Sequence, residues 1–199
     1  MYKRQEFLSI GAGYLWYIAP NIGNVPELAN LNIRLALTMA INREAITNDV
    51  LKDGSKPTYT AVPPQFATGP DGSDFAADQT QFAEVCSYDA AKAADYWAKG
   101  LEELGITELS LDMVVDADDA PQKVAQVIKE QWETTLPGFT VNLVIEPKKQ
   151  RLQDMQEGTF EIGLTRWGPD YADPMTYLGM WVTGNSNNYG FCLLYTSDA

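Results

Sequence analysis

The side chains best suited to chemistry lie in one run near the end of the chain, residues 166–174 (RWGPDYADP). The segment before this run alternates apolar and polar residues as a strand does, and residues 175–178 after it are predicted to form a helix. The turn Trp167-Gly168-Pro169-Asp170 therefore places an indole face and a carboxylate at the end of a strand. Because ligands of open α/β sheets sit beyond the carboxyl ends of strands, Asp170 is the first candidate for a ligand contact.

The two carboxylates of this run, Asp170 and Asp173, also have structural explanations. Asp side chains accept backbone N–H bonds in turns and at helix N-caps. For Asp173, which precedes Pro174 at a predicted helix start, the sequence favours capping. For Asp170 the ligand role and the turn role are equally supported by the local spacing, and both stay open.

The composition argues against several kinds of site. The 199 residues include 27 acidic and 14 basic side chains, for a net charge of −13, which argues against nucleic acid, whose binding depends on Lys and Arg meeting phosphates. There is no His, so the commonest general base and borderline-metal ligand is missing. The cysteines Cys86 and Cys192 are far apart, which favours neither a disulfide framework nor a thiolate metal site. We expect no metal and no cofactor.

A second acidic cluster contains Asp116, Asp118 and Asp119. A calcium loop needs a defined series of oxygen ligands with a Gly and a closing Glu. Ala120 and Pro121 follow instead, so the three acids are predicted to lie at a helix entry, where the helix dipole favours negative charge.

The two ends of the chain match no structural pattern around them. Residues 1–5 and 191–199 resemble translated adapter read-through, and we expect both to be non-native. The domain is then expected to span residues 6–190 of a fragment. No apolar stretch approaches the ~20 residues that cross a bilayer.

The first half of the chain is predicted to contain one strand and helical segments. Residues 14–18 (YLWYI) have the composition of a buried strand. From Glu27 apolar residues recur every three to four positions and predict one buried helix face: Leu28, Leu31, Leu35 and Met39. Asn42 is predicted to cap a continuing turn that Gly54 ends. Residues 56–81 form a long loop, for which a functional role and disorder both stay open.

The second half alternates strands and helices. A helix is predicted from Asp89, its N-cap, to about Leu104, with Gly105 ending it. Strands are predicted at 108–116, 139–145 and 159–166, with helices at 121–136 and 150–157, the latter ended by Gly158. This β-α-β-α-β order predicts the α/β class, with helices covering a mostly parallel sheet.

Several stretches carry a resemblance to one family: residues 32–44 (NIRLALTMAINRE), 87–93 (SYDAAKA), 131–133 (QWE), 158–161 (GTFE) and 167–174 (WGPDYADP). Together they resemble the extracytoplasmic solute-binding proteins of ABC importers, oligopeptide/dipeptide type (family 5). The first three are similar to a helix, a helix start and a helix end of that family, and the last two to its "G-x-F-D" and "W-x-x-D-Y-x-D-P". The resemblance covers nearly all of residues 7–190.

The resemblance implies a fold and partners. The fold would be a periplasmic-binding-protein-like lobe of cluster C, type II, and this chain most of the C-terminal lobe. Its partners would be a short peptide, the membrane permease of an ABC importer and a missing N-terminal lobe of the same protein. The location would be extracytoplasmic, in the periplasm or as a cell-surface lipoprotein, and the protein would not be an enzyme.

The resemblance also implies roles for site residues. Asp170 would pair with the peptide α-ammonium, Trp167 would wall the first side-chain pocket, and backbone groups near Trp167 and Gly168 would pair with the peptide as an added strand. Arg166 and Tyr171 complete the expected ligand-binding set. Some peptide binders grip a carboxylate with arginines at the positions of Met155 and Leu164, which are apolar here, while Arg166 is out of register with both.

Two other functions remain as alternatives. An oligosaccharide binder of the same family would use Trp16, Trp167 and Trp181 to stack on sugar rings. A carboxylate-dependent glycosidase would need Asp170 and Asp173 as its acid and nucleophile, and the composition offers no other base.

Overall fold

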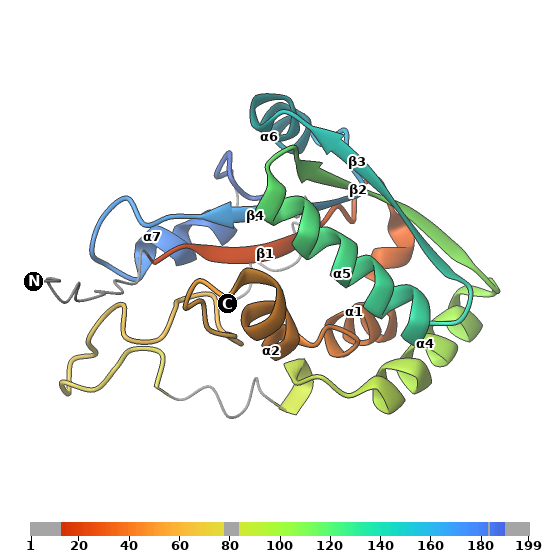
Figure 1. The fold of residues 1–199 in the computed structure, drawn as a ribbon, viewed down its shortest axis with the longest axis horizontal. Helices are drawn as coiled ribbons and strands as arrows, with labels where there is room; N and C mark the ends of the chain where they lie inside the picture. Colours follow the sequence, from red (N-terminus) through yellow and green to blue (C-terminus); the bar gives the residue numbers. More distant parts are fainter. Residues whose placement is uncertain (1–12, 78–83, 183, 190–199) are drawn as a thin grey trace, which may run out of the picture.

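The computed structural model describes residues 13–77, 84–182 and 184–189. Its centre is a four-stranded sheet in the order β1-β4-β2-β3 (Figure 1). Parallel pairing joins β2 to β3 and to β4, while β1 is antiparallel to β4. The bounds of the strands are β1 Leu15–Pro20, β2 Leu109–Asp116, β3 Phe139–Glu146 and β4 Ile162–Trp167. The predicted α/β class with a mostly parallel sheet is confirmed.

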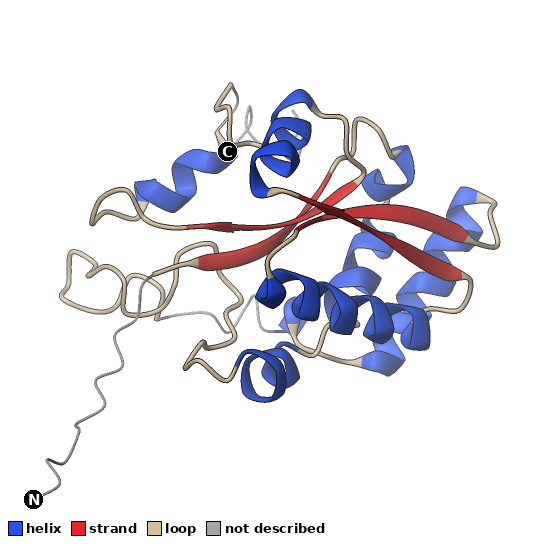
Figure 2. Cartoon of the chain, turned by 45° about the horizontal axis from the view of Figure 1, so that its top comes forward, coloured by secondary structure: helices blue, strands red, loops and turns tan. Residues whose placement is uncertain are grey.

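Helices cover both faces of this sheet (Figure 2). One face packs against the longer helices, α1 Leu31–Met39, α4 Ala90–Leu104 and α5 Asp119–Thr135, together with the short α2, Arg43–Ala45. The other face packs against α6, Lys148–Glu157, and α7, Met175–Leu178. Short turns complete the elements: η1 Pro26–Ala29, the π-helical η2 Ile46–Leu51 and η3 Gly179–Trp181.

The main core lies between the sheet and the longer helices. Trp97 of α4 and Trp132 of α5 both contact Phe139, with ring centroids 5.0 and 5.7 Å away. Each indole N–H also donates a hydrogen bond to a distant carbonyl, Trp97 to Pro137 and Trp132 to Leu37, at 2.8 Å in both cases. Buried indoles need such partners, so these bonds fix the helices at defined positions on the sheet.

Local capping signals agree with the predictions. The side chain of Asn42 accepts from the backbone N–H of Ala45, and that of Asp89 from Lys92. Gly105 and Gly158 end α4 and α6 in left-handed conformations, with φ of 68° and 74°. Each of these contacts spans only a few residues, which is why the sequence was sufficient to find them.

The prediction for the first helix was partly wrong. Asn30 caps α1 through the N–H groups of Asn32 and Ile33, so the residues before it form the separate turn η1, Pro26–Ala29. The buried side of α1 is accordingly formed by Ile33, Ala36, Leu37 and Met39, whereas Leu31 is 58% exposed. The segment after Asn42 ends at Lys52, not Gly54, because the Lys52 N–H bonds to the Thr47 carbonyl in a left-handed turn.

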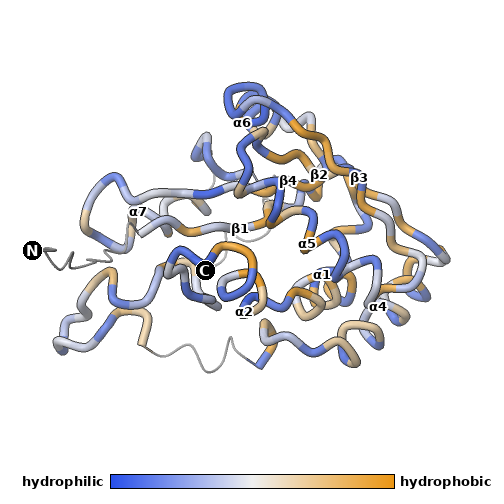
Figure 3. The backbone as a smooth tube through the Cα atoms, in the orientation of Figure 1, coloured by the Kyte–Doolittle hydropathy of each residue, from blue (hydrophilic) through white to orange (hydrophobic). Residues whose placement is uncertain are grey.

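Asp116 corrects a second prediction. It is not a helix-entry acid but the buried last residue of β2, 3% exposed, and its Oδ1 lies 2.6 Å from Nε of Arg151, which is 1% exposed. Arg151 comes from α6, which is hydrophilic along almost its whole length (Figure 3). The ion pair therefore attaches a polar helix to the end of the central strand. Of the predicted entry acids, Asp118 and Asp119 do lie at the start of α5.

At Val141, side chains of α5 occupy the outer edge of β3. The backbone N–H of Val141 donates to Glu133 Oε1 at 2.9 Å, and its carbonyl accepts from Lys129 Nζ. Lys129 and Glu133 also form an ion pair at 2.6 Å. The two backbone groups of Val141 that point away from β2 are thus already satisfied.

Replacing Asp116 with Asn is expected to lower the free energy of unfolding by about 3–5 kcal/mol, since Arg151 would stay buried without a counter-charge. Urea titration followed by circular dichroism measures the change. The matched control is Asp95→Asn, an equal loss of charge at an exposed position of α4, expected to change stability by less than ~0.5 kcal/mol. Equal stability of the two variants would contradict a stabilising role of the pair.

Candidate functional site

The candidate site lies where two distant segments leave the sheet together. The antiparallel register pairs Leu15 with Trp167, so the residues before β1 lie beside those after β4. A Cβ on Gly168 would lie 2.6 Å from the Tyr14 ring, and Gly13, at φ +69°, has Pro169 and the Tyr177 hydroxyl within 3.1 Å of such an atom. The close contact of the two segments therefore depends on glycine at both positions.

The wall behind these segments is formed by α7 and the long loop. Tyr177 is fully buried and donates a hydrogen bond from its hydroxyl to the Gly13 carbonyl, and burial raises its pKa, which keeps the hydroxyl protonated. Phe66 packs edge-on against Tyr177, with centroids 4.9 Å apart, and Val62 is buried in the same cluster. The described part of the loop, to residue 77, therefore supports the site wall.

Asp170 and Asp173 have separate roles. Asp173 Oδ1 accepts the Met175 N–H at 2.8 Å, so Asp173 has the predicted structural role at the start of α7, although Pro174 occupies the N-cap position itself. Asp170 is exposed, and its backbone N–H donates to Oγ1 of the buried Thr176 at 2.9 Å. Within the described part of the chain, the Asp170 carboxylate has neither a hydrogen bond nor an ion pair. The backbone of Asp170 is thus held while its charge faces solvent.

Arg166 and Trp167 point to opposite faces of the sheet, as neighbours on a strand must. Trp167 packs with Leu15, Tyr177 and Met180 on the α7 face, and its indole N–H is buried without an acceptor among the described residues. The Arg166 guanidinium lies on the other face, 5.5 Å from the Trp16 ring centroid. The expected ligand-binding residues therefore do not all line one surface.

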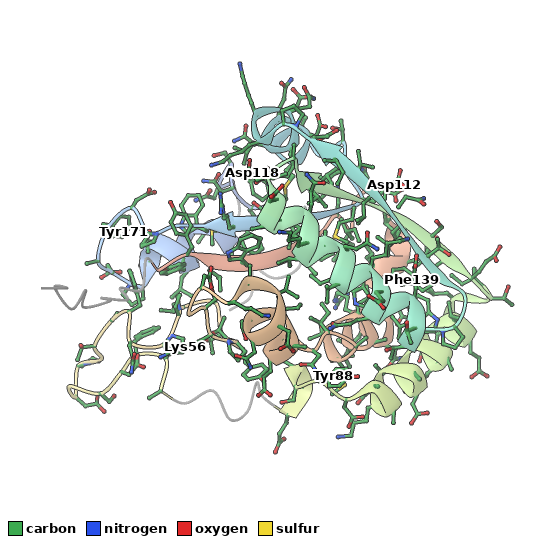
Figure 4. The ribbon with its side chains drawn as sticks, viewed as in Figure 1. Lys56, Tyr88, Asp112, Asp118, Phe139 and Tyr171 are labelled. Atoms are coloured by element: carbon green, nitrogen blue, oxygen red, sulfur yellow. The ribbon has the colours of Figure 1, made fainter. Side chains whose placement is uncertain are left out.

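Exposed aromatic and apolar side chains are concentrated around these segments. Five of the ten large apolar residues that are exposed in the described structure flank the site: Tyr14, Tyr171, Met175, Trp181 and Val182. Figure 4 shows Tyr171 on the loop between β4 and α7. Such a concentration is typical of a surface that another molecule covers.

The three indoles proposed for sugar stacking do not form one platform. Trp16 faces the helices α1, α4 and α5, and Trp167 faces α7. The reason is that Trp16 pairs with Arg166, the neighbour of Trp167, and neighbouring residues on a strand point to opposite faces of the sheet. Trp181 packs edge-on against Tyr17, with centroids 5.4 Å apart. The glycosidase alternative is also weakened, because Asp173 is used in the helix cap.

A separate hollow of about 250 Å³ is lined by Ile41, Asn42, Arg43, Glu44, Tyr59, Ser87 and Tyr88. It lies among α2 and the loops beside it, away from α7. The Arg43 guanidinium there already donates to the carbonyls of Thr38 and Cys86 and lies over the Tyr59 ring. This arginine is therefore used to hold the fold together.

Sequence reasoning missed the residues that position the site. Thr176 and Tyr177 lie in a four-residue helix with no distinctive spacing, and Gly13 and Tyr14 precede a strand whose partner is far away in the chain. Only the antiparallel pairing of β1 with β4 brings them together. Within the described residues, no group of three or more His, Cys, Asp or Glu side chains is arranged to hold a metal ion, and no helix has the length and apolar character to cross a membrane.

These features indicate the class first: a ligand-binding α/β protein with a mixed sheet flanked by helices, and with the exposed Asp170 carboxylate and several aromatic side chains where β1 begins and β4 ends. The chain belongs to the bacterial extracellular solute-binding proteins, family 5, whose model matches residues 2–189.

The relatives are peptide-binding proteins. A dipeptide-binding protein of Lactococcus lactis is 43% identical over 164 residues, which cover 82% of this chain and 29% of the relative. The structure of Listeria monocytogenes OppA bound to peptide superimposes with a TM-score of 0.82 at 33% identity, over 91% of this chain and 36% of that one. A solved peptide-binding protein of a peptide ABC transporter reaches a TM-score of 0.83 at 31% identity, over 89% of this chain and 78% of the other.

The likeness confirms the predicted fold, a periplasmic-binding-protein-like lobe of the OppA type. The chain spans about a third of the length of the curated relatives that it matches. The proposed read-through at residues 1–5 and 191–199 lies outside the described residues, and so do Cys192 and the outer limits of the 6–190 domain.

Replacing Thr176 with Val is expected to weaken ligand binding and to lower the free energy of unfolding by about 1–3 kcal/mol, because the Asp170 N–H loses its acceptor in a partly buried place. Calorimetry and urea titration measure the two effects. Thr176→Ser keeps the hydroxyl and should recover most of both. A serine variant as impaired as the valine variant would point to lost packing and not to the lost hydrogen bond.

Proposed function

We propose that this chain is the C-terminal lobe of a protein that captures short peptides in an extended conformation, between two lobes, for import. The observation that carries the proposal is the Asp170 carboxylate, which is exposed at the end of the sheet, anchored through its backbone to Thr176 and without a counter-charge in the described structure. The relatives support the ligand class, since they are named dipeptide-binding and oligopeptide-binding proteins.

The chemistry of capture follows from this carboxylate. A peptide α-ammonium has a pKa of ~8 and is charged at neutral pH. Asp170 supplies the opposite charge, and closing a second lobe over the pair would exclude water and strengthen a charge-assisted hydrogen bond. The backbone groups near Trp167 and Gly168 would pair with an extended peptide as with an added strand.

The remaining parts of the function rest on the family. The partners are the membrane permease of an ABC importer and an N-terminal lobe of the same protein. The location is extracytoplasmic, either periplasmic, as for the periplasmic OppA relatives, or at the cell surface as a lipoprotein. We propose binding without catalysis, and without a metal or cofactor. The oligosaccharide alternative gains no support, because Trp16 and Trp167 lie on opposite faces of the sheet.

Replacing Asp170 with Asn in the full-length protein that carries this chain is expected to weaken binding of free peptides by roughly 2–5 kcal/mol. This equals about 30-fold to several thousand-fold in affinity. The reason is that the enclosed ammonium would face a neutral partner. N-acetylated peptides lack this charge, so they should bind the wild type poorly and lose little more in the variant.

Calorimetry on the two proteins with free and acetylated peptides forms a double-mutant cycle, whose coupling energy isolates the pair. Asp173→Asn, an equal loss of charge three residues away, is the control and should keep the preference for free peptides. A coupling energy near zero, or equal binding of free and acetylated peptides, would remove Asp170 from the ammonium role.

A further inference from the structure

Arg166 is the one arginine of the described chain that makes no hydrogen bond. The other three all donate: Arg34 to the carbonyls of Leu28 and Ala29, Arg43 to those of Thr38 and Cys86, and Arg151 to Asp116. Those three serve the fold, and Arg166, with its side chain 33% exposed, differs from them.

The guanidinium of Arg166 is held by aromatic rings. Its central carbon lies 5.8 Å from the Tyr14 ring centroid and 5.5 Å from that of Trp16. Contacts between a cation and aromatic faces restrict where the side chain lies but use none of its N–H donors. The planar fork of donors is therefore positioned and still available.

The charged neighbour of Arg166 is a weak partner. Asp118, at the start of α5 (Figure 4), places Oδ2 3.9 Å from Nη2 of Arg166, and the Asp118 side chain is 68% exposed. At that distance and exposure the pair contributes little to stability. A carboxylate arriving from outside, with direct hydrogen bonds to the fork, would form a stronger interaction than Asp118 does.

The position of Arg166 relates it to the ligand. It precedes Trp167 at the end of β4, beside the segment that carries Asp170, and it rests on Tyr14, which contacts Gly168. On a chain of net charge −13, the positioned guanidinium of Arg166 is a positive group that would attract negative groups of a ligand.

We propose that Arg166 binds a carboxylate of the peptide, so that affinity depends on a negative group of the ligand. This rests on the proposed function, in which Asp170 binds the α-ammonium. The carboxylate has two sources, an Asp or Glu side chain and the peptide C-terminus. Arg166, at the end of β4, and Asp170, four residues later, would bind the two opposite charges of one extended ligand, and would fix its direction.

The test uses four tripeptides, Ala-Glu-Ala and Ala-Gln-Ala, each with a free or an amidated C-terminus, titrated into the full-length protein. The wild type is expected to bind at least one carboxylate-bearing form about tenfold more tightly than amidated Ala-Gln-Ala. A preference for Glu over Gln identifies the side chain as the source, and a preference for the free over the amidated end identifies the C-terminus.

Arg166→Gln should abolish this preference, while the variant still binds all four peptides. Arg166→Lys keeps the charge without the planar fork and should retain part of the preference. Lys149→Gln, an equal loss of charge at an exposed position of α6, is the control and should retain all of it.

Two outcomes overturn the inference: equal binding of all four peptides by the wild type, or a preference that persists in Arg166→Gln. Either result leaves the proposed function standing if binding still depends on Asp170 and a free α-amine. Failure of every peptide to bind would overturn both proposals.

Discussion

The structure depends above all on the antiparallel pairing of β1 with β4. It joins Leu15 to Trp167 and Pro20 to Ile162, and so ties the start of the described chain to its last strand. Without it the sheet would be a parallel β-α-β-α-β unit in which β4 is an unpaired edge strand. With it, Gly13 and Tyr14 lie against Pro169 and Gly168, Tyr177 closes over the junction, and Trp16 lies beneath Arg166. The candidate site is a product of this pairing.

The pairing also explains why the site divides into two sides. Alternation along β4 sends Arg166 toward the longer helices and Trp167 toward α7. Asp170 lies beyond the end of the strand, where it belongs to neither face. A ligand that crosses the end of the sheet can therefore meet a cation on one side and an indole wall on the other. A ligand that stacks flat on several indoles has no comparable surface.

Sequence reasoning was reliable where structure is local. Asn42, Asp89, Gly105 and Gly158 end or begin helices through contacts that span a few residues, and each was identified correctly. The separation of Asp173 as a cap from Asp170 as a candidate ligand was local in the same sense.

It was unreliable where contacts are distant in the chain. Asp116 has the sequence environment of a helix-entry acid, and only Arg151, 35 residues away, makes it a buried ion-pair partner. One wrong prediction was local: Leu31 has the right period for a core residue, but the Asn30 cap, which spans two to three residues, places it at the exposed start of α1. The positioning role of Thr176 and the aromatic support of Arg166 depend on tertiary packing. No spacing rule could have found either.

The side chains over the edge of β3 have a consequence for how copies of this lobe can associate. With Glu133 and Lys129 on the backbone groups of Val141, an approaching strand would have to displace an ion pair before it could add to that edge. The opposite margin, at β1, has no such guard among the described residues. A strand that extends the sheet beside Val141, from this protein or another, therefore meets a barrier that the described residues do not form at β1.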